Sequence, residues 1–402
     1  MNQTILSRSA AIESEIIETR REIYRHPELS NREERTGALI AQRLEQMGLE
    51  VKSGIARHGV VAILRGPGDR VIAARANMDA LPVEDVLDVP YRSTISGVKH
   101  ACGHDAESAI LLGVAEVLSG MRNELAGTIV FIFQPAEEGP PEGEEGGAAL
   151  MIKEGVLEME PQIQEIFALH MMPTLDALTI GYSVGPILAS NDNFDIKVIG
   201  EQTHAAFPHT GVDAILLSSY VVQGLQSMLT REFNALDSVV ISPGVIRGGN
   251  RWNIIPEEVL IEGTVRTLSP EIRASIPALL DERIGAIVAA YGGRHEFRYH
   301  HVNPVTVNDP ELARAAVPIL ESIGDANSII QGPPMMASED FSHFAEKVPG
   351  FYFFLGVRNE SRGIVHMVHS PKFDIDESCL AYGVNAFSTL LLERTRSERL
   401  NK

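Results

Sequence analysis

The sequence predicts an α/β protein, an α/β/α sandwich that carries an inserted α+β domain. Before Gly185, apolar β-type runs alternate with segments of helical periodicity, a pattern typical of a sandwich. After Gly185 the elements follow the order β-α-β-β-α-β, which is typical of a split-βαβ domain with an antiparallel sheet. From Asp309 the first pattern returns. The expected boundaries are 1–185 and 303–402 for the main domain and 186–302 for the insertion.

Apolar spacing and turn residues predict the individual elements. His26-Pro27 breaks a helical pattern, and the Gly66-Pro67-Gly68 turn separates two short strands. The nearly continuous apolar run at 128–133 predicts a strand covered on both faces of its sheet. In the main domain we expect two helices within 10–47, strands 60–64 and 71–76, helix 106–118, strands 128–133, 164–169 and 351–355, and helix 376–394. In the insertion we expect strand 194–199, helix 213–229, strands 238–245 and 258–267, helix 270–291 and strand 294–301.

Composition limits the class of protein. The 402 residues are 44% hydrophobic and 22% charged, which fits a globular protein with a large core. The formal charge of −20 argues against a nucleic-acid partner and against binding to an anionic membrane. No signal peptide and no run of eighteen apolar residues is visible, so the expected location is cytoplasmic. The two cysteines are too few for a disulfide framework, and Cys379 reads as a small core residue.

The other cysteine lies among metal-ligand types. Cys102 and His104 flank Gly103 in a loop directly before a helix, where both side chains could converge on one ion. The start of a helix also lowers the pKa of a thiol. The alternative is a buried cysteine beside a histidine that caps the helix, and Asp105 is expected to be the N-cap residue.

Further candidates lie at the ends of predicted strands, where ligands bind in open α/β sheets. Glu137 and Glu138 follow strand 128–133, and neighbouring carboxylates suit one group on a metal and one facing a substrate. The alternative is a solvated acidic loop. His170 is expected to end the next strand, and His369 lies in a loop. Asp79 follows strand 71–76 and could orient a ligand by accepting its hydrogen bond.

Short motifs recur in order across essentially the whole chain: Met78–Pro82, His100–Asp105, Gln134–Gly139, Ala168–His170, His204–His209, Asn253–Pro256, Ser338–Phe341 and His369–Pro371. In these motifs the chain resembles the M20 metallopeptidases. More narrowly, it resembles their amidohydrolase branch, which includes hippurate hydrolases, N-acyl-amino-acid amidohydrolases and plant auxin-conjugate hydrolases. The similarity is specific for family and much less so for substrate.

The resemblance implies a di-metal catalytic domain with an inserted lid domain that mediates dimerisation, and hence a homodimer or dimer-based oligomer. It implies two divalent ions per chain, Zn²⁺, Mn²⁺, Co²⁺ or Ni²⁺. Glu137 would be the general base and His204 would bind the oxyanion or the substrate, whereas composition alone makes His204 an ordinary loop histidine. Asn253 and Arg266 would hold the carboxylate end of the substrate, although Arg266 alone reads as an exposed strand-end cation. The implied metal ligands are Cys102, His104, Glu138, His170 and His369.

Two residues depart from the pattern of that family. Asn77 stands where the family usually has Asp, and Glu107 stands where it has His. Neither is an implied ligand, but both lie near the Cys102 loop, so metal choice or substrate preference is expected to differ from that of relatives. A carboxylate at Glu107 could also contact a cationic part of the substrate.

The predicted function is metal-dependent hydrolysis of the amide bond of an N-acyl or aminoacyl amino acid, which releases an amino acid and a carboxylic acid. A dipeptidase or carboxypeptidase-like peptidase of the same family is the first alternative. A metal-free thiol hydrolase built on Cys102 is the second, and it leaves the Glu137-Glu138 pair without a role. A non-catalytic binding or scaffold protein is the third, against which the retained Glu137 argues.

Overall fold

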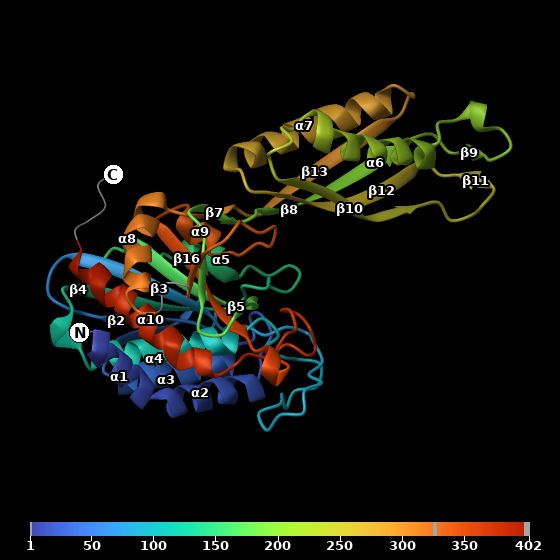
Figure 1. Ribbon diagram of the computed structural model, residues 1–402. Coiled ribbons are helices and arrows are strands. Elements are labelled where there is room, and N and C mark those ends of the chain that lie inside the picture. The colour runs from blue at the N-terminus through green and yellow to red at the C-terminus, as the bar shows by residue number, and fades with distance from the viewer. Residues whose placement is uncertain (1, 325–327, 398–402) are drawn as a thin grey trace. The chain divides into compact units, whose positions relative to one another are not determined.

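A computed structural model describes residues 2–324 and 328–397, which form two compact units (Figure 1). The first unit comprises Met1–Gly185, Val307–Pro333 and His343–Lys402, and the second comprises Pro186–Thr306 and Pro334–Ser342. The second unit therefore takes in Pro334–Ser342, a segment that the sequence placed in the main domain. Roles for the units as a catalytic domain and a lid stay predictions.

The first unit is built on an eight-stranded sheet of order β1-β2-β4-β3-β5-β16-β6-β15. Its strands are β1 (Glu50–Ile55), β2 (Gly59–Leu64), β3 (Arg70–Asn77), β4 (Gly127–Gln134), β5 (Glu165–Asp176), β6 (Ile180–Tyr182), β15 (Ile329–Gln331) and β16 (Gly350–Arg358). β4, β3, β5 and β16 are parallel to one another. At one edge of the sheet, β2 pairs antiparallel with β4, and β1 pairs antiparallel with β2. Every residue of β2, β3 and β4 is buried, so the predicted double-sided cover of this sheet is confirmed.

Helices pack their apolar residues with those of the sheet in one core cluster. They are α1 (Asn2–Ala11), α2 (Glu13–Arg25), α3 (Glu34–Gln46), α4 (His104–Ser119), α8 (Pro310–Glu321) and α10 (Ser378–Arg396). Outside this cluster lie α5 (Gly147–Lys153), α9 (Ser342–Ala345) and the 3-10 turns η1 (Arg122–Glu124) and η3 (Glu360–Arg362). α2 ends at Arg25 with His26 as its C-cap, as the His26-Pro27 break predicted, and Figure 1 shows α2, α3 and α4 gathered beside the sheet. Cys379 is fully buried in α10, so its prediction as a core residue is confirmed. Among the described residues, no helix is both long and apolar enough to cross a membrane.

The second unit contains a four-stranded antiparallel sheet of order β10-β12-β8-β13 with two helices. Its elements are β8 (Asn191–Ile199), β9 (Thr203–His204), η2 (Pro208–Thr210), α6 (Ala214–Arg231), β10 (Val239–Gly248), β11 (Ile254–Ile255), β12 (Glu258–Thr267), α7 (Pro270–Ala289) and β13 (Arg294–Asn303). β8, α6, β10, β12, α7 and β13 reproduce the predicted order. Phe194, Ile196 and Val198 alternate along β8 into a core shared with α6 and α7. Strands β7 (Gly185–Leu188) and β14 (Thr306–Asn308) form a further two-stranded sheet.

A buried carboxylate joins three elements of the second unit. Asp192, at the start of β8, accepts bonds of 2.8 Å from two nitrogens of Arg273 on α7. It also accepts bonds from the Tyr299 hydroxyl at 3.0 Å and from the Val302 amide at 2.9 Å, both in β13. Burial alone raises the pKa of Asp192, but these donors outweigh burial and hold it below its usual value. Asp192 is therefore a charged anchor of β8, α7 and β13.

We expect Asp192→Asn to lower the free energy of unfolding by about 3 kcal/mol at pH 7, because it removes the carboxylate charge that accepts two bonds from Arg273 at a largely buried position. A carboxyl with a lowered folded pKa contributes stability above its unfolded pKa, about 3.9, and loses it as the pH falls through the folded value. The difference between wild type and variant should therefore persist from pH 7 to about pH 4 and shrink only below. Urea unfolding followed by circular dichroism measures both.

The control is Asp195→Asn on the same strand, because Asp195 is 38% exposed in its ion pair with His300 and should contribute less than about 0.5 kcal/mol. Equal destabilisation by both substitutions would contradict the role given to Asp192.

Candidate functional site

A glycine that no other residue can replace without strain shapes the Cys102 loop. Gly103 has φ +94°, and a Cβ there would lie 2.6 Å from the Cγ of Met171 in β5. The close approach brings the Cys102 Sγ within 3.5 Å of the His170 Nε2. The prediction that His170 ends its strand was wrong, because β5 continues to Asp176. Pairing with β3 reaches only Ala168, so His170 still lies just beyond the paired end of the neighbouring strand.

Six ligand-type side chains converge in the first unit. In each of three overlapping groups, the ligand atoms lie within 4.8 Å of one another: Cys102 with His104 and His170; Cys102 with Glu138 and His369; His104 with Glu137 and Glu138. The structure thus brings together the five predicted ligands and the predicted base. Since Cys102, His104 and Glu138 each belong to two groups, the cluster offers adjacent positions for a pair of ions.

Asp79 links two of the ligand segments. The His104 Nδ1 lies 3.1 Å from the Asp79 Oδ1 and 3.0 Å from the Asp79 carbonyl oxygen. Both are acceptors, so in the neutral ring Nδ1 carries the proton and the Nε2 lone pair faces the cluster. The Asp79 Oδ2 accepts bonds from the Glu138 amide at 3.0 Å and the Ser30 hydroxyl at 2.7 Å. Asp79 is therefore placed to orient His104, as the sequence predicted.

Positive φ values place the two loop ligands. Ala136 (φ +56°) turns the chain after β4 so that Glu137 and Glu138 face the cluster, and its amide donates to the buried Glu33 carboxyl at 2.8 Å. Burial, followed by the nearby Asp79 charge, raises the pKa of Glu33 to about 8. His369 (φ +65°) donates its amide to the Ala101 carbonyl at 2.7 Å, and its Nε2 lies 3.2 Å from the Glu138 Oε1. Such backbone conformations are costly and cluster at functional sites.

The electrostatics of the cluster call for a cation. Burial and then the Glu138, Glu137 and Glu107 charges raise the pKa of the Cys102 thiol well above its usual range, and so outweigh any lowering by the helix start. Burial lowers the pKa of His104, but its bond to Asp79 and the Glu107 and Glu138 charges outweigh burial and raise it to about 10. A divalent ion reverses both effects, because it deprotonates a thiol and takes the imidazole lone pair.

The residues present fit such an ion. The buried Nε2 of His104 has no hydrogen-bond partner within the described part of the chain, which is the expected state of a ligand nitrogen. Two ligands on one tetrahedral zinc lie about 3.6 Å apart for sulfur and nitrogen and about 3.4 Å apart for nitrogen and oxygen. The Cys102–His170 distance of 3.5 Å and the His369–Glu138 distance of 3.2 Å match these spacings. A donor set of sulfur, nitrogen and oxygen suits a transition metal.

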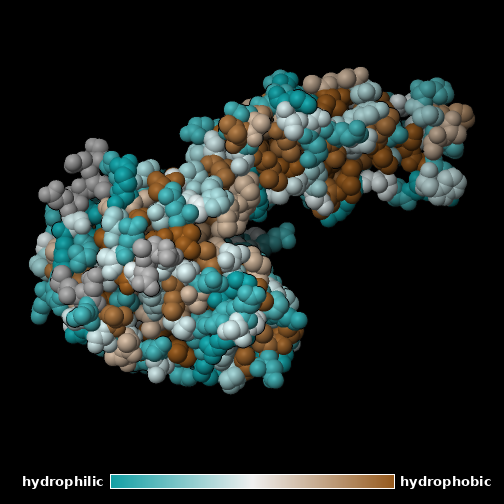
Figure 2. All heavy atoms as spheres, in the orientation of Figure 1, coloured by the Kyte–Doolittle hydropathy of each residue, from teal (hydrophilic) through white to brown (hydrophobic). Residues whose placement is uncertain are grey.

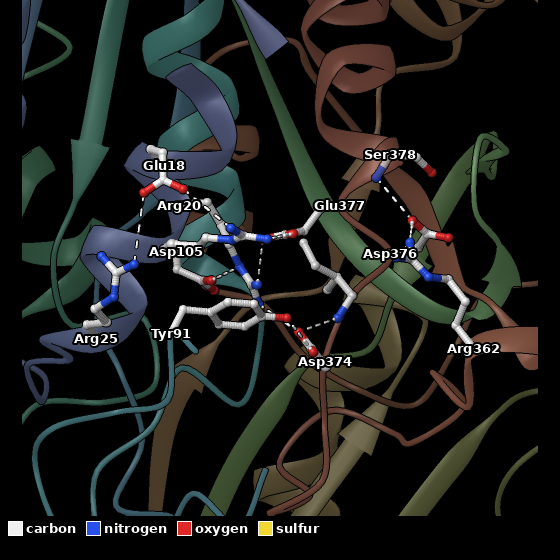
Figure 3. A network of polar contacts seen from close by, with 12 residues as sticks. Glu18, Arg20, Arg25, Tyr91, Asp105, Arg362, Asp374, Asp376, Glu377 and Ser378 are labelled. Atoms are coloured by element: carbon white, nitrogen blue, oxygen red, sulfur yellow. Dashed lines mark hydrogen bonds and ion pairs between the residues drawn. The ribbon is translucent and has the colours of Figure 1, made fainter. Parts of the chain in front are cut away.

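A buried arginine that the sequence analysis missed, Arg20, joins three acidic side chains, as Figure 3 shows. Arg20 of α2 bonds Asp105 at 2.6 Å, Asp374 at 2.9 Å and Glu377 at 3.2 Å. Asp105 was wrongly expected to be the N-cap of α4; Gly103 takes that place, and Asp105 lies in the first turn beside His104. Arg20 thereby ties α4 to the segment that follows His369. An arginine on the apolar face of α2, between Ile16 and Ile23, was the available signal.

Asn77 and Glu107, the two departures from the family pattern, contact each other beside the ligand cluster. Glu107, in the first turn of α4, is 1% exposed, and its Oε1 lies 3.5 Å from the His170 Nε2. Its Oε2 accepts a hydrogen bond of 3.3 Å from the backbone nitrogen of Asn77. This carboxylate is buried against a predicted ligand, and its contact with a cationic part of the substrate stays a prediction.

The predicted substrate-binding residues lie in the second unit. His204 in β9 pairs with Ile254 of β11, so Asn253 is its neighbour. The His204 Nδ1 accepts a bond of 3.0 Å from the Ala206 amide, which leaves the proton of the neutral ring on Nε2. Arg266 in β12 donates to the Met336 carbonyl at 3.2 Å, so it is not the exposed cation that its position alone indicated. The approach of these residues to the ligand cluster stays a prediction.

Comparison with known proteins agrees with this geometry. A model of peptidase family M20/M25/M40 matches residues 73–393. The chain is 38% identical to thermostable carboxypeptidase 2 of Saccharolobus solfataricus over 95% of this chain and 96% of that protein. It is 35% identical to an N-acetylcysteine deacetylase of Bacillus subtilis over 94% and 97%. The YXEP protein of Bacillus subtilis, described as a dinuclear metal-binding peptidase, has 32% identity and a TM-score of 0.85 over 97% of this chain and 99% of that one.

The family model covers most of the chain, and the dinuclear description of a solved relative agrees with overlapping ligand groups that suit two ions. The predicted family, fold class and enzyme class are confirmed. The chain belongs to peptidase family M20/M25/M40 and is a metal-dependent hydrolase.

Proposed function

We propose that this enzyme hydrolyses the amide bond of small N-acyl amino acids with two divalent ions held by Cys102, His104, Glu138, His170 and His369. The observation that carries the proposal is the place of Glu137. Its carboxylate belongs to a ligand group with His104 and Glu138, yet the other five side chains already supply the two ion positions. Glu137 is thus left to move protons at the reacting bond.

The ions would supply Lewis-acid polarisation of the amide carbonyl and lower the pKa of a water from roughly 15.7 to about 7. Glu137 accepts a proton from the water that attacks the amide carbon, and later delivers it to the leaving nitrogen. Its side chain is only 10% exposed, so little bulk water competes for that proton. Asp79 keeps the proton of His104 on Nδ1, which preserves the Nε2 lone pair for binding.

Residues of the second unit complete the proposed site. His204 presents an Nε2 proton and would donate it as a hydrogen bond to the developing oxyanion, a contribution of about 3–4 kcal/mol for a well-placed donor. Asn253 and Arg266 would hold the free carboxylate of the amino acid, the arginine by a charge-assisted pair. The second unit would act as a lid and as the contact surface of a homodimer. We further propose a cytoplasmic enzyme with Zn²⁺, Mn²⁺, Co²⁺ or Ni²⁺.

A carboxypeptidase-like peptidase activity is the second candidate, because a relative with 38% identity bears the name of a carboxypeptidase. Its substrate also ends in a free carboxylate, so the same ligand cluster and the same arginine would serve it. The two activities differ in the group on the far side of the amide, an acyl chain or an amino-acid residue with a charged amine.

The proposed function is tested with a panel of N-acyl amino acids, the matching dipeptides, and N-acyl amino acid amides that lack the carboxylate, assayed for released amine. We expect N-acyl amino acids to be hydrolysed fastest, the amides to be poor substrates, and Arg266→Met to remove the difference between acid and amide. A strong chelator should abolish activity, and a divalent ion should restore it. Faster hydrolysis of dipeptides would favour the peptidase, and activity that survives metal removal would contradict the proposal.

We expect Glu137→Gln to keep two ions per chain but to lose activity, because an amide cannot accept the proton of the water. General-base contributions are on the order of 10²–10⁴-fold. Metal analysis and kcat measured on the same preparation check this, with Glu142→Gln in the neighbouring exposed loop as the control. Near-normal turnover of Glu137→Gln would remove Glu137 from the mechanism.

His204→Ala should leave metal content unchanged while lowering kcat more than it raises KM, the mark of an interaction made mainly in the transition state. A mixture of His204→Ala and Glu137→Gln chains shows whether His204 serves its own chain or a dimer partner. Partial recovery of activity in the mixed dimer supports action across subunits. An unchanged kcat in His204→Ala would exclude His204 as the oxyanion donor.

A further inference from the structure

The side of the ligand cluster at His170 contains one more acidic group than the proposed ligand set uses. Glu107 lies three residues after His104 on α4, so both side chains lie on the same face of the first turn. Its Oε2 accepts a bond from the Asn77 amide at the end of β3, and this anchor directs Oε1 toward the His170 Nε2 at 3.5 Å. The separation is close to the roughly 3.4 Å expected for nitrogen and oxygen on one tetrahedral ion.

The tautomer of His170 shows what lies between these atoms. The His170 Nδ1 is 2.9 Å from the Met171 carbonyl oxygen, an acceptor, so Nδ1 carries the proton of the neutral ring. Nε2 therefore presents a lone pair both to the Glu107 carboxylate and to the Cys102 Sγ, which is also 3.5 Å away. Nε2 thus lies 3.5 Å from both a carboxylate oxygen and a sulfur, an arrangement that suits a cation bound beside the ring.

We propose that Glu107 binds one of the two ions together with Cys102 and His170, as a sixth protein ligand of the metal pair. The inference rests on the metal site of the proposed function. Glu107 lies outside the closest group formed by Cys102, His104 and His170 and meets it through His170. To join that group the carboxylate would rotate about its last torsion, which has broad energy minima, and give up the bond from the Asn77 backbone nitrogen while α4 stays in place.

The proposal predicts a particular metal preference. Carboxylate oxygen is a hard ligand that favours Mn²⁺, whereas thiolate favours Zn²⁺. With Glu107, this ion meets sulfur, nitrogen and oxygen together. Removing Glu107 should therefore weaken the binding of Mn²⁺ more than that of Zn²⁺. Removing the Cys102 sulfur should weaken the binding of Zn²⁺ more than that of Mn²⁺. A side chain that only supports the fold would not separate the two metals.

The experiment measures Kd for Mn²⁺ and Zn²⁺ at each position of the purified full chain by competition with a chromophoric chelator. Glu107→Gln should weaken Mn²⁺ at one position by more than about 100-fold, beyond the 10–100-fold typical of groups that only support a ligand, with a smaller loss for Zn²⁺. Cys102→Ser should weaken Zn²⁺ more than Mn²⁺ at the same position. Glu116→Gln on the same helix and Cys379→Ser, a buried thiol in α10, are the matched controls and should change neither Kd.

Glu107→Asp keeps the charge on a shorter side chain and covers the case in which Glu107→Gln does not fold; it should weaken Mn²⁺ less than Gln but measurably. Co²⁺ absorption of each loaded variant should report the lost ligand as an altered d–d band. Unchanged Kd values and an unchanged Co²⁺ spectrum would overturn the assignment of Glu107 and leave the proposed function intact. A wild-type chain that binds no ion would overturn both.

Discussion

The carboxylate of Asp79 is the interaction on which the arrangement of the ligand cluster depends. One oxygen meets the His104 ring, and the other accepts from the Glu138 amide and the Ser30 hydroxyl. Burial of this carboxylate opposes its charge, yet its donors keep the pKa below the usual value. Because a buried charge must keep its partners, the first turn of α4 and the loop after β4 are held at fixed positions. Two ligand segments are thus oriented by one side chain.

A second buried charge, that of Arg20, fixes the segment that follows His369. Arg20 is 0% exposed, and the rings of Tyr24 and Tyr91 lie under its guanidinium at 4.7 and 4.8 Å. Its ion pairs reach Asp105 in α4 and Asp374 in the segment after His369. The neighbouring Lys99 also bonds the Pro371 carbonyl at 2.8 Å. Buried contacts thus hold the segment that follows the exposed ligand His369, which limits the entropy lost when an ion binds.

Local patterns predicted the strands, the helices and the ligand types, and contacts across the sequence supplied the rest. Apolar runs identified β3 and β4, and the chemistry of Cys102, His104 and Glu138 identified the kind of site. The length of β5 depends on β16, about 180 residues away, so its end was misplaced. Local sequence predicts Asp105 as a helix cap, but its carboxylate instead accepts a bond from Arg20, which lies 85 residues earlier in the chain. The pKa of Cys102 follows from carboxylates contributed by separate segments, which no local rule includes.

The acidic surroundings of the cluster link metal binding to folding. Asp79, Glu107, Glu137 and Glu138 bring negative charge to one buried region, and in a low-dielectric interior their repulsion opposes the folded state. A divalent pair converts that repulsion into attraction, and an ion that binds only the folded chain stabilises it by RT ln(1 + [M]/Kd). The carboxylates that serve metal binding and proton transfer therefore cost folding free energy unless a cation binds among them. The same charges set the affinity for the ions and the stability of the cluster. The Asn77 and Glu107 departures from the family pattern therefore alter the affinity and the stability together.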